Sequence, residues 1–234
     1  MADFRSEIRA IGDAYSARVD DIHDDCVHTR ILWNNLYVRI KHYGENPIVQ
    51  NPVTGRVASG AELANKVLPS LFRLNSRSFK DVVAQFELFV AALLRLWLAE
   101  KPALLSEKAI DVATLLACRT LADARTAAVH EAAESTIAGL MFGRPERWFN
   151  YLRKNLSVRI SAVDETAFVE MKARRDVLEH NNGIVESMYL EKAKAAAKFS
   201  SGDRIEVVES DVDEAYDVVQ RLIRLATMDA NSAA

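Results

Sequence analysis

Cysteine is scarce in this chain, and motifs that bind metals or phosphate loops are missing. The 234 residues contain two cysteines, Cys26 and Cys118, which form neither a disulfide framework nor a metal-ligand spacing. No glycine-rich phosphate loop and no cluster of His and Cys appears. Two free thiols fit a reducing compartment. We therefore expect neither a metal nor an organic cofactor.

Long apolar runs and a strong charge of one sign are also missing. The longest apolar stretch, residues 88–99, is interrupted by Arg95 and is too short to span a membrane. The first residues lack the apolar core of a signal peptide. A net charge of −3 excludes a strongly basic, general polyanion binder. We expect a cytoplasmic protein without a membrane span, whose contacts with any nucleic acid are local.

Hydrophobic periodicity predicts an all-α protein. Apolar residues recur every three or four positions from Phe4 to Ile40, which indicates a long amphipathic helix, broken or bent near Thr29. Gly44 is the expected end of this helix, and Asn, Pro and Gly in 44–60 predict a loop or hairpin. A helical pattern resumes over 63–74, and residues 75–78 are expected to break it before an apolar helix at 79–99.

Capping signals predict the ends of the later helices. Asp111 can cap a short helix, Pro145 fits the first turn of another, and Ser161 with Asp164 resembles a capping box. These signals place helices at 111–118, 121–141, 145–155, 161–180 and 211–228, with a brief extended segment at 204–208. A 50% apolar content is enough to bury a sizeable core. We expect one helical bundle.

An arginine, an acid and a histidine lie beside a tight turn in the segment ARRDVLEHNNGIV, residues 173–185. Arg175 is a permanent cation whose shape matches phosphate oxygens, and His180 can transfer a proton near neutral pH. Together they suit the cleavage of a phosphodiester without a metal. Two other pairs have the same spacing, Arg18 with His23 and Arg125 with His130. Only Arg175 is followed by a short polar residue, Asp176, and only His180 by an Asn-Asn-Gly turn.

The run from Arg175 to Val185 resembles the signature of the HEPN superfamily (higher eukaryotes and prokaryotes nucleotide-binding domains). That signature is an arginine, usually followed by Asn, His or Asp, with a histidine a few positions on. Residues 79–102 and 140–158 resemble the core helices of bacterial HEPN ribonuclease-like proteins, and 189–193 and 201–219 resemble their closing segment. The resemblance makes 78–234 a HEPN-like helical domain and 1–77 an N-terminal long-helix extension with the loop 44–60, packed as one unit.

The resemblance implies a metal-independent endoribonuclease that acts as a homodimer, in toxin–antitoxin or antiviral defence. In such a site Arg175 would bind phosphate and stabilise charge, His180 would transfer a proton, and Asp176 would orient one of them. RNA is the implied substrate, and an antitoxin or another regulatory protein is the second expected partner. The alternative is a non-catalytic HEPN-like dimerisation or regulatory module. Asp176, where Asn is common, and Glu179, where an apolar residue is expected, favour that alternative.

The spacing of the motif sets a geometric condition. On a regular helix, five positions correspond to a rotation of about 140°, so Arg175 and His180 do not share one face. They converge if the Asn-Asn-Gly turn unwinds the helix at His180, or if the helix end stands in a cleft open on both sides. A two-fold dimer packed on this helix would supply such a cleft and a second histidine.

Several further residues are candidates for contacts with RNA. Asn181 and Asn182 could bind ribose or base, although turn chemistry explains them equally well. The stretch 144–175 has a net charge of +4 against −7 for the rest, and Arg174 and Lys154 in it are candidate RNA-binding residues. Glu179 would raise the pKa of a neighbouring imidazole if it lies close, which would either tune the site or spoil it.

Overall fold

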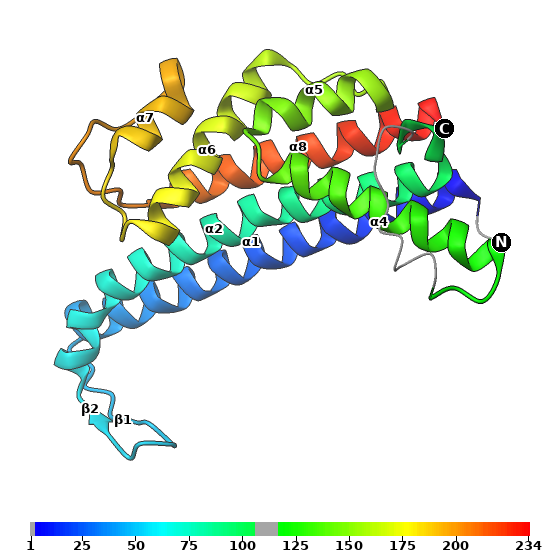
Figure 1. Ribbon diagram of the computed structural model, residues 1–234. Coiled ribbons are helices and arrows are strands. Elements are labelled where there is room, and N and C mark those ends of the chain that lie inside the picture. The colour runs from blue at the N-terminus through cyan, green and yellow to red at the C-terminus, as the bar shows by residue number, and fades with distance from the viewer. Residues whose placement is uncertain (1–2, 106–116) are drawn as a thin grey trace.

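The computed structural model describes residues 3–105 and 117–234, and three long helices form its axis. Helix α1 (Phe4–Tyr43) runs antiparallel to α2 (Gly60–Glu100), and α8 (Glu209–Ala233) packs against both, as Figure 1 shows. At about 1.5 Å per residue, the 40 residues of α1 span about 60 Å. The all-α class predicted from the sequence is confirmed.

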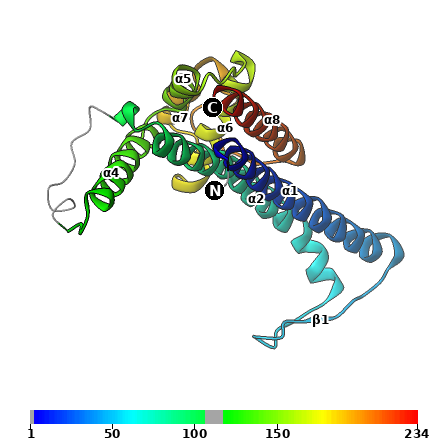
Figure 2. The same ribbon diagram turned by 90° about the vertical axis from the view of Figure 1, so that its right-hand side faces the viewer.

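Shorter helices cover one part of this axis. Helix α4 (Leu121–Met141) packs on α2, α5 (Pro145–Leu156) packs on α6 and α8, and α6 (Ala162–His180) packs on α2 and α8. Helix α7 (Ser187–Ala193) packs against α6. Short 3-10 turns occupy Pro102–Leu105 and Lys194–Ala196. Helix α4 packs near the C-terminal end of α2, where Arg95 pairs with Glu134, and α6 packs nearer its middle, where Lys80 pairs with Glu179. Figure 2 shows α4 running off to the left of the axis and α5 above it.

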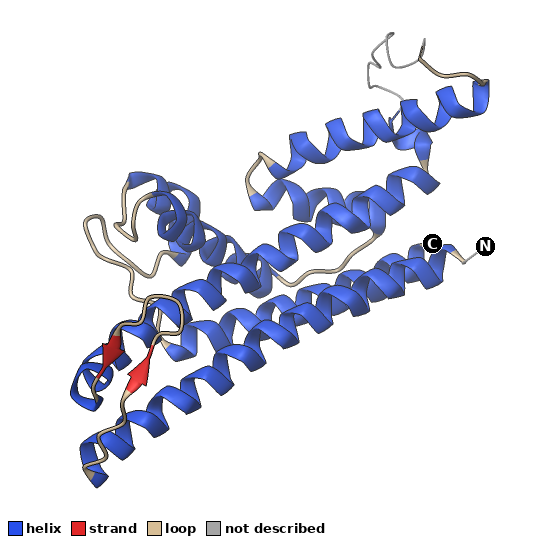
Figure 3. Cartoon of the chain, turned by 90° about the horizontal axis from the view of Figure 1, so that it is seen from below, coloured by secondary structure: helices blue, strands red, loops and turns tan. Residues whose placement is uncertain are grey.

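The C-terminal half of α1 and the N-terminal half of α2 project beyond the other helices. They are joined by a two-stranded antiparallel hairpin of β1 (Val49–Gln50) and β2 (Val57–Ala58), drawn red in Figure 3. We call residues 27–77 the arm. Gly44 ends α1 with φ 68°, as the sequence predicted, and a capping box between Ser59 and Glu62 begins α2.

The core is aromatic where α2, α5 and α6 meet. Phe86 packs edge-on against Phe168 at 4.7 Å between ring centroids and stacks with Phe149 at 6.0 Å. All three side chains are fully buried. This cluster fixes α6 against α2, and it thereby fixes the position of the predicted motif.

The helix break predicted at 75–78 is wrong, and of the break or bend predicted near Thr29 the break is wrong. Helix α1 continues through Thr29, next to Arg30, whose buried guanidinium bonds Glu209 of α8 at 2.7 Å. Helix α2 continues through 75–78, because Asn75 is buried and donates to the carbonyl of Val207 instead of competing for its own backbone. The boundary drawn at 77/78 therefore falls inside α2. The short helix expected at 111–118 lies, up to residue 116, outside the described residues.

The other predicted ends agree closely with the structure. Helix α4 covers 121–141 as expected, α5 begins at Pro145, and α6 is capped by Ser161. Helix α8 begins two residues before Asp211 and extends five residues beyond Met228. In the 204–208 segment, Arg204 forms an isolated antiparallel bridge with Ile184.

By length and composition alone, α2 is apolar enough to cross a membrane. In its most apolar window, however, 56% of the residues are buried against the rest of the chain, as in the core helix of a soluble protein. One such helix is weak evidence for a membrane span.

Candidate active site

Helix α6 carries the predicted motif at its C-terminal end. The helix is regular up to His180, and the N–H groups of Asn181 and Gly183 both donate to the carbonyl of Val177, at 3.0 and 3.2 Å. The chain then turns through Asn182 and Gly183, which have φ of 51° and 79°. The helix is therefore not unwound at His180, because the left-handed residues of the turn begin after it.

A pocket of about 540 Å³ brings the motif together with other elements. Arg175, Asp176, His180 and Asn181 all line it. The opposite wall comes from α7 and from the junction between α4 and α5. These further lining residues include Phe142, Arg144, Glu146, Met188, Tyr189 and Lys192, and α6 itself adds Lys172. Arg175 and His180 thus reach one pocket from a regular helix end.

Asp176 lies at the centre of a cluster of cations. Its carboxylate accepts from Nζ of Lys172 at 2.7 Å, from Nζ of Lys192 at 3.0 Å and from Nη1 of Arg175 at 3.3 Å. Burial alone would raise the pKa of Asp176, but the hydrogen bonds and charges of Lys172 and Lys192 outweigh it, and the pKa lies below its usual value. Asp176 is therefore ionised at neutral pH and links α6 to α7.

The Arg175 side chain bonds Asp176 and is partly exposed to solvent. Its side chain is 24% exposed, and its Nε is buried without a hydrogen-bond partner among the described residues. His180 is exposed at the end of α6, and its ring has no hydrogen bond within the described part of the chain. A cation that has spare donors and an imidazole that is open to solvent therefore line the same pocket.

Glu179, next to this arrangement, is bonded to α2. Its carboxylate accepts from Nζ of Lys80 at 2.8 Å. This hydrogen bond, together with the charge of Lys80, lowers the pKa of Glu179. The acid that seemed atypical in the motif thus has a structural partner 99 residues away in the sequence.

Arg174 does not fit the substrate-binding role predicted from the sequence. Its side chain is fully buried, and it donates to Glu170 at 2.9 Å and to Asp211 of α8 at 2.5 Å. The guanidinium also lies 4.6 Å from the centre of the Phe79 ring. Because adjacent helix positions differ by about 100°, Arg174 faces the core while Arg175 faces the pocket. We correct its assignment to a structural residue.

Glu170 completes this internal network. It accepts from Arg174 and from the hydroxyl of Tyr189 at 2.7 Å. Burial raises the pKa of Glu170, and burial together with the hydrogen bond to Glu170 raises the pKa of the Tyr189 hydroxyl. The network joins α6, α7 and α8 directly behind the pocket.

Two other predicted RNA-binding residues lie apart from the pocket. Lys154 is exposed in the last turn of α5, and Asn182 is exposed in the turn after α6, and neither lines the pocket. Sequence reasoning missed the contributions of Arg144 and Lys192, which are distant in sequence. The ion pair of Lys172 with Asp176 could have been predicted, because the two residues are four positions apart on one helix.

Comparisons of the chain with protein-family models, with curated proteins and with solved structures find no match. The HEPN resemblance is therefore carried only by the residues quoted above, and it stays a prediction. Among the described residues, no group of three or more His, Cys, Asp and Glu side chains is arranged to hold a metal ion.

Proposed function

We propose that the chain is a metal-independent endoribonuclease of HEPN type. The observation that carries this proposal is that Arg175 and His180 line one pocket, beside a carboxylate that contacts three cations. A phosphate group needs a cation with directed donors, and proton transfer needs an accessible imidazole. A second pocket is also lined by an arginine and a histidine, Arg125 and His130, but its carboxylate, Glu134, makes an ion pair with Arg95 alone among the described residues, whereas Asp176 contacts three cations.

The proposed reaction is attack of a ribose 2′-hydroxyl on the adjacent phosphate. One group removes the proton of the 2′-hydroxyl while another protonates the departing 5′-oxygen, so that a 2′,3′-cyclic phosphate and a 5′-hydroxyl are formed. His180 is the proton-transfer group, and Arg175 stabilises the charge that develops on the phosphate. Asp176 holds Arg175 and limits the positive charge that Lys172 and Lys192 bring to the pocket.

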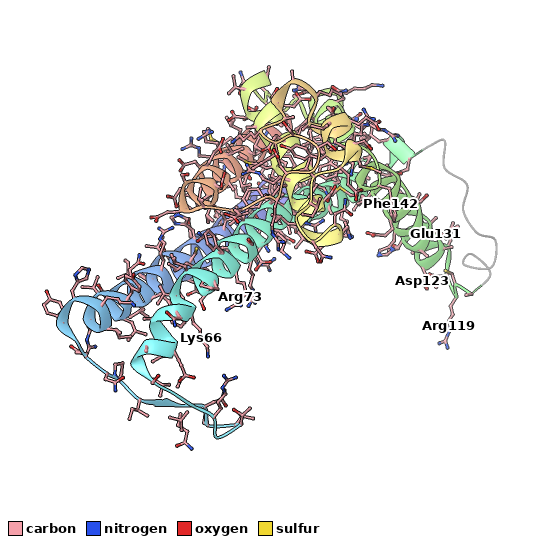
Figure 4. All side chains as sticks on the ribbon, turned by 90° about the vertical axis from the view of Figure 1, so that its left-hand side faces the viewer. Lys66, Arg73, Arg119, Asp123, Glu131 and Phe142 are labelled. Atoms are coloured by element: carbon pink, nitrogen blue, oxygen red, sulfur yellow. The ribbon has the colours of Figure 1, made fainter. Side chains whose placement is uncertain are left out.

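One protomer offers a single imidazole in this pocket, so the proposed site is completed by a second copy of the chain. Phe142, at the end of α4 in Figure 4, is 95% exposed, and Met188 is 58% exposed. Both line the pocket, and both could be covered when two copies pack together with α6 near the two-fold axis. This supports a homodimer whose two His180 side chains act together.

Substitution of His180 by alanine tests the proposal against a matched control. His130 is also exposed and also follows an arginine by five positions, but it lies on α4, far from α6 in the sequence. We expect His180→Ala to abolish cleavage of total RNA and His130→Ala to retain it, with both variants folded by circular dichroism. Equal activity of both variants would contradict the assignment of His180.

A non-catalytic HEPN-like dimerisation or regulatory module is the second candidate. It is favoured by the extent to which charges near the pocket already have partners, such as Lys172 with Glu87 at 3.3 Å and Arg144 with Glu191. In that case the parent protein would dimerise and would leave RNA intact. A role in toxin–antitoxin or antiviral defence, with a regulatory protein as partner and a cytoplasmic location, belongs to the leading proposal.

A further inference from the structure

The arm differs in charge from the rest of the molecule. Residues 27–77 contain seven Lys and Arg against two acids, a net of +5, so the remainder of the chain carries −8. Two of these cations have acidic partners that neutralise them, Arg30 with Glu209 and Arg39 with Glu45. The other cations make the projecting arm a surface of positive potential on an acidic protein.

Four cations lie along one side of α2, with Pro69, near which the helix bends in Figure 2, between the first and the second of them. Lys66, Arg73, Arg77 and Lys80 fall within about 60° of one another at 100° per residue, and they extend over about 21 Å of helix. We call them the basic stripe. Lys66 and Arg73 project from the same side of α2 in Figure 4. The exposed apolar residues Leu68 and Phe72 lie to one side of the stripe, because Leu68 is rotated by at least 120° and Phe72 by at least 80° from each of its members.

The outer three cations of the stripe are available to a ligand. Lys66 and Arg73 are exposed, and neither makes an ion pair within the described residues. Arg77 is 83% exposed and has only a 3.5 Å contact with Asp81 on its own helix, which is worth little in water. Glu62, near Lys66, is engaged by Ser59 in the capping box.

The stripe ends at the candidate active site. Its last member, Lys80, bonds Glu179, the residue before His180. Two turns further along the same side of α2, Glu87 contacts Lys172, which in turn holds Asp176. The side of α2 that carries the free cations is therefore the side that the end of α6 covers. Lys80 is paired with Glu179 and does not line the pocket, so the free cations end one helical turn before the contact with α6.

We propose that the basic stripe binds the backbone of single-stranded RNA and guides the strand to the pocket at His180. This inference rests on the proposed function. Exposed cations along one side of a helix can contact successive phosphates of a strand without reading its bases. The stripe would therefore raise affinity for long RNA whatever its sequence, and the pocket would perform the cleavage.

The test is a triple variant, Lys66→Gln, Arg73→Gln and Arg77→Gln. Glutamine has a helix propensity close to those of Lys and Arg, so α2 should be retained. A second triple variant, Arg5→Gln, Arg119→Gln and Arg125→Gln, removes the same charge from exposed positions outside the arm. A labelled 20-nucleotide 2′-O-methyl RNA, which has no 2′-hydroxyl to attack, measures binding. Cleavage is followed on a 20-nucleotide RNA and on the dinucleotide UpA.

We expect the stripe variant to raise the Kd for the 2′-O-methyl RNA about tenfold at 0.1 M salt. It should also reduce the slope of log affinity against log salt by about 2, because each phosphate contact with a single strand contributes about 0.7. Cleavage of the 20-nucleotide RNA should fall about tenfold relative to cleavage of UpA. The control variant should bind and cleave like the parent protein.

The outcomes separate the two proposals. If both triple variants bind the 2′-O-methyl RNA with the same affinity, the proposal that the stripe binds RNA is overturned, even when His180→Ala still abolishes cleavage. If the parent protein cleaves neither substrate, the proposed function falls, while the binding comparison still decides the stripe. If the stripe variant loses affinity only for a protein partner and not for RNA, the arm is a protein-binding surface and the inference is wrong.

Discussion

Replacement of Arg174 by methionine tests the view that this residue holds the fold together behind the pocket. The substitution keeps a long side chain but removes the hydrogen bonds to Glu170 and Asp211. It leaves the Glu170 carboxylate, whose side chain is only 2% exposed, without its cation. Breaking a buried ion pair in this way costs about 3–5 kcal/mol.

A loss of this size is large for a single domain. Native proteins are stable by about 5–15 kcal/mol, and a loss of 3–5 kcal/mol lowers the Tm of a chain of this length by about 6–20 °C. The double variant Glu170→Gln with Arg174→Met removes the unpaired charge and keeps an acceptor for the Tyr189 hydroxyl. It should therefore be more stable than Arg174→Met alone.

Urea unfolding, followed by circular dichroism at several pH values, measures the effect. Burial already raises the pKa of Glu170 above its ordinary value of 4.5, and loss of Arg174 should raise it further. The folded state then holds a proton that the unfolded state releases, so the stability of Arg174→Met should fall as the pH rises from about 4.5 through the folded-state pKa. The deficit relative to the parent should be smaller at pH 5 than at pH 8.

The opposite pattern would refute this reasoning. If Arg174→Met stays within about 1 kcal/mol of the parent protein and instead weakens RNA binding, Arg174 reaches the substrate, as the sequence first suggested. That figure lies clearly below the cost of leaving a buried charge unpaired.

Three further predictions address the pocket, the helix packing and the dimer. Asp176→Asn should destabilise the protein by about 1–2 kcal/mol at pH 7. In acid-unfolding curves, this difference in stability from the parent should vanish as the pH falls from 3.8 through the lowered pKa of Asp176. A difference in stability that stays constant with pH would contradict this prediction. Gly12→Ala should cost about 1–3 kcal/mol in thermal unfolding, because its Cβ would lie 2.3 Å from Oγ1 of Thr227 on α8; an unchanged Tm would be the contrary result. Phe142→Ser should leave stability within about 0.5 kcal/mol but shift the protein towards monomer in sedimentation; an intact dimer would exclude Phe142 from the interface.

Local signals in the sequence were sufficient for most helix ends. Gly44 and Ser161 mark ends because the chain itself supplies the left-handed residue or the cap. The predicted break at 75–78 was wrong because a distant group decides it. Asn75 is satisfied by the carbonyl of Val207, 132 residues away, and no local pattern reports such a contact.

Only the part of the candidate site that lies on one helix could be predicted from the local sequence. The spacing from Arg175 to His180 belongs to one helix, and this helix could be placed from its caps. The difference between Arg174 and Arg175 could not be predicted, because a Glu and an Arg four positions apart usually form a surface pair. Only the packing of α8 and of Phe79 buries Arg174. The contribution of α7 to the pocket likewise depends on tertiary structure.

The most direct test of the central claim is to incubate the parent protein with RNA in excess EDTA and to analyse the ends of the fragments. We expect cleavage that yields 2′,3′-cyclic phosphate and 5′-hydroxyl ends, because Arg175 and His180 act without a metal. Intact RNA from a folded, dimeric sample, or cleavage that disappears when EDTA is added, would contradict it.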